Sequence, residues 1–562
     1  MIDHLTFLFY SFIFLFSSIG YGLKFSKIIN NNLINLNLGW YGVIGFFFIS
    51  IISITSSFFY AHNYLHNLII HIIGVFFFVT YFLKDKKKFE YKFLICLYLS
   101  LLIGAYVFKN HDDFSYYHLT YALNLSENSF IVGTGNFSHG FRTFSSLFYY
   151  HSTLLLPFID YYLFHIGPFY ILVFVNYVII YKLIYDREFN SNNITYYFSL
   201  ISLIFINVVF YRIGEHGTDR SSQILLVLIF LLFIEILNNK KTSNILLTNV
   251  SLLVILISLA ASMKAIYYLY FILIPIIFFK KKLFNELIKK KNSIIILFIF
   301  FSIFLNLTTY YLNTGCFLYP AEKTCFIENE WSIPSKEVKQ MSTHYEWWAK
   351  AGGGPNYSHK MEKIEYIKNF VWLDNWIKRH FFNKVSDTLF GVIFICFLVV
   401  LSFFYFNKKK LIPNKNNFSL IYVVMLIFLI EWFLNHPSMR YGGYVLIGLP
   451  IIFFSSSIIS RLSISKKHIV KITLVFIVLS IVVFNFRNLL RIDKEINVYG
   501  YEPLKSPYFF TDTVESKIIL DTDNITIYSP INNTCWASKT PCSYNTNLKS
   551  SNFLWMDMVS RK

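Results

Sequence analysis

The stretch FLICLYLSLLIGAYVF, residues 93–108, followed almost at once by HDDFSYYH, residues 111–118, decides the fold of this chain. The first part is apolar and long enough to cross the hydrocarbon core of a membrane as a helix. The second part places two adjacent carboxylates and two histidines where that helix leaves the bilayer. Such groups are costly there unless water, a metal ion or a polar substrate satisfies them. A hydrated loop cap and a catalytic carboxylate that faces a lipid-linked substrate are the two interpretations to separate.

The same apolar pattern recurs along the whole chain. Its 562 residues are 55% hydrophobic and only 14% charged, a balance typical of membrane proteins. The expected fold class is therefore all-α, an integral membrane bundle of many helices. Runs of about 17–20 apolar residues predict about fourteen membrane-spanning helices, at residues 4–23, 40–60, 66–83, 93–108, 167–185, 195–213, 222–238, 245–261, 265–279, 293–312, 387–406, 418–434, 442–460 and 468–485.

The net charge of +19 comes mostly from lysines and arginines in short turns between the apolar runs. Clusters of this kind mark the cytoplasmic side of a membrane protein, so nucleic acid is not an expected partner. The other turns then lie on the opposite side. The outer loops 109–166 and 313–386 and the tail 486–562 are therefore expected to be extracytoplasmic. The basic turns are residues 84–88, 240–241, 280–282, 289–291, 408–410 and 461–467.

One apolar segment, residues 147–164, does not fit as a crossing. If it spanned the membrane, every later basic turn would move to the outside. We expect a re-entrant or interfacial helix there. The chain then divides into a polytopic domain, 1–485, and an extracytoplasmic tail, 486–562, in which strand-like runs at 517–520 and 525–528 indicate a small α+β subdomain.

Four cysteines form two close pairs in the outer segments: Cys316 with Cys325, and Cys535 with Cys542. Neither pair has the C-x-x-C spacing of a metal site. Two local disulfides, formed in an oxidising compartment, are expected instead.

The outer turns also collect the unusual polar residues, which are the candidate site. Asp112 and Asp113 are the candidate catalytic carboxylates. Asp113 is favoured because, on a helix, Tyr117 and His118 would lie beside it. Cations could neutralise a departing phosphate while the carboxylate deprotonates an incoming hydroxyl. Mg or Mn is left open as a cofactor. The candidate substrate- or phosphate-binding residues are His118, His139, Arg142, Arg212, His216, Arg220, Lys264, His436 and Arg440.

This arrangement resembles the C-type (GT-C) membrane glycosyltransferases, in which an acidic residue lies in an early outer loop. The chain is also similar to a group of poorly characterised bacterial membrane proteins of that type. The motifs that carry the resemblance are Asp113 with Tyr117-His118-Leu119, Gly133-Thr-Gly-Asn136, Arg142, Tyr319-Pro320 with Trp331-Ser-Ile-Pro334, and Pro437-Ser-Met-Arg440-Tyr-Gly. The pattern departs at Thr120, where proline is expected, in one or three additional helices before the acidic loop, and in its doubled carboxylate.

The resemblance implies a sugar transferase of the plasma (inner) membrane, with its active site on the extracytoplasmic face. The donor would be a polyprenyl-phosphate-linked sugar, and the acceptor a lipid-linked or cell-surface glycan, with membrane lipids as further partners. Two alternatives remain. An O-antigen-type polymerase or ligase would rely on cations without a catalytic carboxylate. A flippase or transporter would need charges at mid-membrane and inverted repeats.

Overall fold

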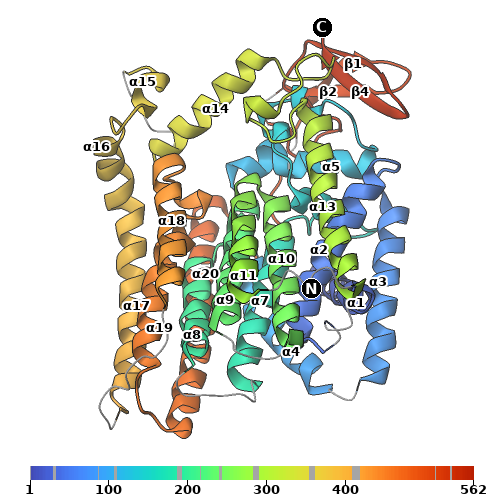
Figure 1. Cartoon of the computed structure of the whole chain (residues 1–562). Helices are drawn as coiled ribbons and strands as arrows, with labels where there is room; N and C mark the ends of the chain where they lie inside the picture. Colours follow the sequence, from blue (N-terminus) through green and yellow to red (C-terminus); the bar gives the residue numbers. More distant parts are fainter. Residues whose placement is uncertain are drawn as a thin grey trace.

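The computed structural model describes most of the chain as a bundle of long helices, with shorter elements gathered at one end (Figure 1). We call this the loop end; its described residues are 111–166, 315–352, 361–376, 500–512, 514–531 and 534–562. The described residues are 2–29, 33, 35–85, 88–106, 111–185, 193–215, 217–238, 243–282, 290–352, 361–407, 418–512, 514–531 and 534–562.

Nine helices of the described chain are long and apolar enough to cross a membrane, and they agree with the expected helical membrane bundle. A helix satisfies its own backbone hydrogen bonds, which a segment crossing lipid must do. The nine are α1 (Ile2–Ile29), α2 (Leu38–Ser57), α3 (Tyr64–Lys84), α7 (Gly167–Tyr185), α9 (Gly217–Asn238), α10 (Ser243–Met263), α13 (Lys290–Thr314), α17 (Ser386–Phe404) and α20 (Lys466–Tyr499).

The remaining expected crossings are also helical but shorter, so the count of about fourteen stays a prediction. The five remaining crossings are α4 (Lys88–Leu101) continued by η2 (Leu102–Ala105), α8 (Ile194–Val209), η7 (Ala265–Ile272) continued by α11 (Leu273–Lys281), α18 (Ser419–Asn435) and α19 (Gly443–Ile459). Two of the five, α4–η2 and η7–α11, change along their length between α-helix and the tighter 3₁₀ form.

Glycines let α1, α2 and α3 pack with their backbones nearly touching. A Cβ atom on Gly45 of α2 would lie 1.6 Å from the carbonyl oxygen of Ser18 in α1, and one on Gly22 would lie 1.8 Å from that of Tyr41. Small residues at helix contacts are a common means of close packing in membranes. The N-terminal helices therefore form a tight unit beside the rest of the bundle.

Other helices turn large apolar side chains outward. Phe390 and Phe394 of α17 are 68% and 60% exposed, and Val478 of α20 is 61% exposed. A contiguous surface of this kind is rare on water-soluble monomers and is compatible with contact with lipid tails.

One sequence-based expectation needs correction. The apolar segment 147–164 is not one continuous helix: α6 covers only Ser146–Ser152, and turns follow it. A helix of this length cannot span the hydrocarbon core. The expected start of the tail, residue 486, lies within α20, which ends at Tyr499 and is followed by Gly500 in a left-handed conformation.

Two antiparallel strand pairs follow in the tail. β1 (Ser516–Asp521) pairs with β2 (Thr526–Pro530), and β3 (Leu548–Phe553) pairs with β4 (Met556–Arg561). The first pair coincides with the strand-like runs seen in the sequence. Both expected cysteine pairs are bonded, with Cα–Cα separations of 3.8 Å for Cys316–Cys325 and 6.1 Å for Cys535–Cys542.

Short elements of the loop end and of the turns next to it surround the candidate site. In chain order they are the π-helix η3 (Phe114–His118), α5 (Leu119–Glu127), η4 (Thr134–Asn136), η5 (His139–Arg142), η6 (Ile213–Glu215), η8 (Glu322–Thr324), α14 (Ser335–Lys350), α15 (Lys363–Ile367), α16 (Leu373–Trp376), η9 (Ile377–Val385) and η10 (Met439–Tyr441).

Candidate functional site

Four charged side chains from four separate segments form one chain of ion pairs next to the loop end. Arg440, in η10, donates from Nη2 to Oδ2 of Asp113 at 2.7 Å and from Nε to Oδ2 of Asp219 at 2.5 Å. The other carboxylate oxygen of Asp219 pairs with the ammonium group of Lys264. Two anions and two cations are thus balanced. We call Asp113, Arg440, Asp219 and Lys264 the ion-pair chain.

Local structure and aromatic rings hold the ion-pair chain in place. Asp219 lies in the first turn of α9, where the helix dipole favours a carboxylate. Its side chain is 5% exposed, so it needs its two cationic partners. The ammonium of Lys264 lies 4.5 Å from the ring centre of Tyr441, and the guanidinium of Arg440 lies 5.3 Å from that of Trp348. Both distances permit cation–π attraction.

The two adjacent carboxylates diverge. Asp112 is exposed, whereas Asp113 is partly buried and faces Arg440. Burial opposes ionisation of Asp113, but the hydrogen bond with His111 and the charge of Arg440 outweigh it and hold the pKa of Asp113 well below its usual range. Asp113 is therefore ionised at neutral pH, and while it is paired with Arg440 it is a weak proton acceptor.

His118 follows Asp113 by five residues on the π-helical turn. Its ring is buried against Phe148, with the ring centres 4.8 Å apart. Burial lowers the pKa of His118 to about 4. The imidazole is consequently neutral at pH 7 and can exchange hydrogen bonds there without carrying a charge.

The C-terminal tail braces the π-helix η3. A π-helix departs from the i→i+4 pattern and leaves backbone carbonyls in need of partners. The amide of Trp536 donates to the carbonyl of Ser115 at 3.1 Å, and the hydroxyl of Tyr544 donates to that of Tyr116 at 3.0 Å. Thr120, the position at which proline was expected, donates its hydroxyl to the carbonyl of Trp536 at 2.9 Å. The Cys535–Cys542 disulfide closes the loop that carries Trp536, and Tyr544 follows this loop directly.

Arg142 has a structural role that the sequence did not indicate. Its guanidinium donates to the Gly135 carbonyl at 3.0 Å, to the Tyr319 hydroxyl at 3.1 Å and to Glu337 at 2.9 Å. Glu337 also pairs with Arg561 of β4. Three of the five N–H groups of Arg142 are thus engaged, and the side chain ties η4 to α14 and, through Glu337, to the tail.

The other expected cations lie outside the ion-pair chain. Arg220 donates to the backbone carbonyl of Arg212 at 3.1 Å. His436 lies 3.8 Å from a carboxylate oxygen of Glu431, and burial lowers its pKa although that carboxylate opposes the shift. His216 lies outside the described residues. Of the expected cations, Arg440 and Lys264 are the ones that the described structure joins to Asp113.

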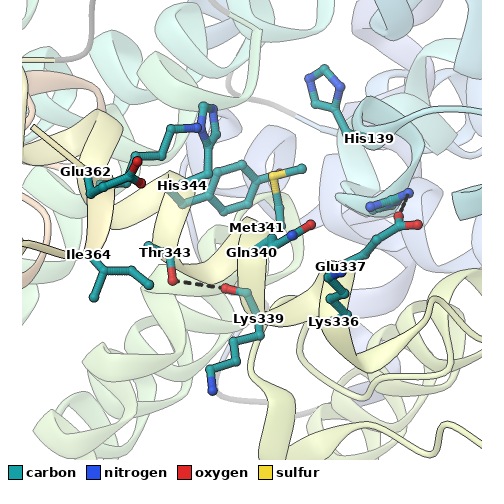
Figure 2. A pocket seen from close by; sticks show the side chains of 13 residues that line it. His139, Lys336, Glu337, Lys339, Gln340, Met341, Thr343, His344, Glu362 and Ile364 are labelled. Carbon is teal, nitrogen blue, oxygen red and sulfur yellow. Dashed lines mark hydrogen bonds and ion pairs between the residues drawn. The ribbon is translucent and has the colours of Figure 1, made fainter. Parts of the chain in front are cut away.

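A cavity of about 880 Å³ lies between η5 and the pair α14–α15 (Figure 2). His139, one of the expected site residues, belongs to its wall and is 3.3 Å from the Tyr116 hydroxyl. We call this the α14 cavity. Its lining residues are His139, Arg142, Lys336, Glu337, Lys339, Gln340, Met341, Thr343, His344, Tyr345, Glu362, Lys363 and Ile364.

Mg or Mn as a cofactor stays a prediction. Within the described ranges, no group of three or more His, Cys, Asp or Glu side chains is placed to hold a metal ion. The oxygens of Asp219 and an oxygen of Asp113 accept from Arg440 and Lys264 instead. We therefore assign no chemical step to Mg or Mn.

Sequence reasoning missed Asp219 and Trp348 as members of the site. A signal for Asp219 was available, because a carboxylate in the first turn of an apolar spanning helix is rare and usually functional. Trp348 carries no such signal, since interfacial tryptophans are common in membrane proteins.

Comparison with known proteins gives one match. The family model described as "Domain of unknown function (DUF8201)" matches residues 5–447. This range contains the whole ion-pair chain and the α14 cavity and stops before the tail. No curated protein and no solved structure matches the chain.

Proposed function

We propose that this chain, which belongs to the DUF8201 family, is a C-type glycosyltransferase of the plasma (inner) membrane. It transfers a sugar from a polyprenyl-phosphate-linked donor to a lipid-linked or cell-surface glycan. The loop end faces the extracytoplasmic side, where both disulfides would be stable. About fourteen crossings place the basic turns in the cytoplasm.

The ion-pair chain is the observation that carries this proposal. Transfer from a phosphate leaving group needs cations for the charge that develops on the phosphate and a carboxylate for the acceptor hydroxyl. Arg440 and Lys264 provide the first requirement and Asp113 the second. Asp113 pairs directly with Arg440, and Asp219 links Arg440 to Lys264. This arrangement explains why a charged cluster is retained beside apolar helices.

The pairing also suggests how the base is activated. In the unliganded protein the hydrogen bond with His111 and the charge of Arg440 together hold the pKa of Asp113 low. A donor phosphate that binds Arg440 competes with the Asp113 carboxylate for the same guanidinium. As that pair weakens, the pKa of Asp113 rises toward its ordinary value and the carboxylate becomes a better proton acceptor. Donor binding and base activation are then coupled through one side chain.

The experiment is in-membrane transfer from a panel of radiolabelled polyprenyl-phosphate hexoses. Asp113→Asn keeps the shape of the side chain and removes its charge, so it should abolish transfer while the protein still folds and inserts. Asp112→Asn, the matched control, should cost much less because Asp112 is exposed.

Loss of transfer in Asp112→Asn together with near-normal turnover in Asp113→Asn would assign the base to Asp112. Near-normal turnover in the double variant would reject carboxylate catalysis at this site.

One observation favours an O-antigen-type polymerase or ligase as a second candidate. Such an enzyme would use cations without a carboxylate base, and the α14 cavity carries Lys336, Lys339 and Lys363 on its wall. Retained activity in the double aspartate variant, with loss on removal of these lysines, would support it.

A further inference from the structure

The α14 cavity has an excess of positive charge that its own carboxylates do not neutralise. Three lysines and Arg142 line the cavity against two carboxylates, Glu337 and Glu362. Glu337 already pairs with Arg142 and with Arg561 of β4. Among the described residues, no carboxylate pairs with Lys336 or Lys339. Both lysines line the cavity from α14 and are exposed. This combination leaves cations available for an anion brought in from outside.

The opposite wall and the floor provide rings and hydrogen-bonding groups. Figure 2 shows His139 on the element opposite the helix that carries Lys339 and His344. The ring of Tyr345 also lines the cavity, and the side chain of Lys363 is 3.0 Å from Nδ1 of His344. The volume of about 880 Å³ lies in the range of ligand sites. Aromatic faces beside polar groups suit sugar rings, which have apolar faces and hydroxyl edges.

The cavity is joined to the ion-pair chain by two short routes. Tyr116 contacts His139 of the cavity wall and belongs to the π-helix that directly follows Asp113. On the other side, α14 carries Tyr345 in the cavity and, three residues later, Trp348 against Arg440. The cavity wall thus contacts the segment that carries Asp113, the carboxylate that would activate an acceptor hydroxyl.

We propose that the α14 cavity binds the acceptor, and that this acceptor is an anionic glycan bearing carboxylate or phosphate groups. The inference rests on the proposed function and identifies the class of its second substrate. The ion-pair chain is electrically balanced, and we assign the sugar donor to it. The cations without carboxylate partners line the cavity. An anionic lipid headgroup is disfavoured because the lysines border a ring-lined cavity of ligand size rather than a flat apolar face.

The test is direct binding to the full-length protein in uncharged phosphatidylcholine nanodiscs, measured by calorimetry. The probes are a hyaluronan hexasaccharide, which bears carboxylates, glucose 1-phosphate, which bears a phosphate, and uncharged chitohexaose. The variant Lys336→Gln/Lys339→Gln removes the cavity cations. The control, Lys323→Gln/Lys378→Gln, removes the same charge from residues that do not line the cavity.

We expect at least one anionic probe to bind about tenfold or more tightly than chitohexaose, and to weaken as salt rises. The cavity variant should weaken that binding about tenfold, and the control by less than about twofold. Equal binding of charged and uncharged probes, no effect of the cavity variant, or no anionic binding at millimolar concentration would overturn the proposal. The proposal is also contradicted if Lys336→Gln/Lys339→Gln leaves probe binding unchanged and reduces only the stabilisation of the protein by added phosphatidylglycerol.

This outcome is separable from that of the proposed function. Asp113→Asn should bind the anionic probe normally, since Asp113 does not line the cavity, while losing transfer. Normal probe binding with normal transfer in that variant would contradict the proposed base and leave the cavity assignment standing.

Discussion

Replacing Arg440 with glutamine should destabilise the fold more than any single substitution of an exposed charge. Glutamine is shorter and neutral, so Arg440→Gln leaves Asp113 and Asp219 without their shared guanidinium. The side chain of Asp219 is 5% exposed and that of Asp113 is 28% exposed. Water cannot solvate such a carboxylate well enough to replace the attraction of the lost guanidinium.

The loss of stability in Arg440→Gln depends on the partners that Asp113 and Asp219 keep. Breaking a buried pair costs about 3–5 kcal/mol. Asp219 keeps Lys264 and Asp113 keeps His111, so we expect the lower end, about 3 kcal/mol. The matched control is Lys378→Gln, because Lys378 and its partner Asp374 are 69% and 77% exposed. An exposed pair contributes at most about 1 kcal/mol.

The assay is reversible unfolding in mixed micelles, followed as a function of denaturant. A double-mutant cycle with Asp113→Asn isolates the pairwise term and should give a coupling of about 1 kcal/mol or more. A cost for Arg440→Gln no larger than that of Lys378→Gln, or a coupling near zero, would refute the ion-pair chain as a structural unit.

Three further outcomes are expected. Tyr544→Phe removes a donor to the Tyr116 carbonyl of η3 and an acceptor for the Cys535 amide. It should cost about 1 kcal/mol or more and speed amide exchange in η3. Tyr528→Phe should do neither, because no hydrogen bond is assigned to the Tyr528 hydroxyl in the described structure. Burial lowers the pKa of His118 to about 4, below the value of about 6.5 in an unfolded chain. The unfolded state thus binds the extra proton, and stability should fall by up to about 3 kcal/mol as pH falls from about 6.5 to about 4; a thermal scan of His118→Gln should show a flatter dependence. Gly45→Ala should lower the melting temperature sharply, because its Cβ would meet a carbonyl oxygen of α1 at 1.6 Å, whereas Gly391→Ala meets nothing within 4 Å and should be neutral.

The sequence alone determined the helical membrane class, the two disulfide pairs and the candidate carboxylates. Each of these depends on information that is local in the chain. An apolar run long enough to cross lipid must be helical to satisfy its own backbone. Cys316 and Cys325 are nine residues apart, a distance that one turn of loop can close. Neighbouring residues such as Asp112 and Asp113 point in different directions on any regular backbone.

Only the tertiary structure decided which charges meet. The Arg440–Asp113 pair joins residues 327 positions apart, and the Arg440–Asp219 pair joins residues 221 apart. The way η10 packs beside the start of α9 sets the Arg440–Asp219 contact, and no local sequence pattern encodes that packing. In the sequence Arg142 and Arg440 are equivalent outer-loop cations; in the fold one is held by Glu337 and the other by Asp113. Partner choice follows from distance and burial in three dimensions, because a charge beside an apolar bundle is stable only where the packing brings an opposite charge to it.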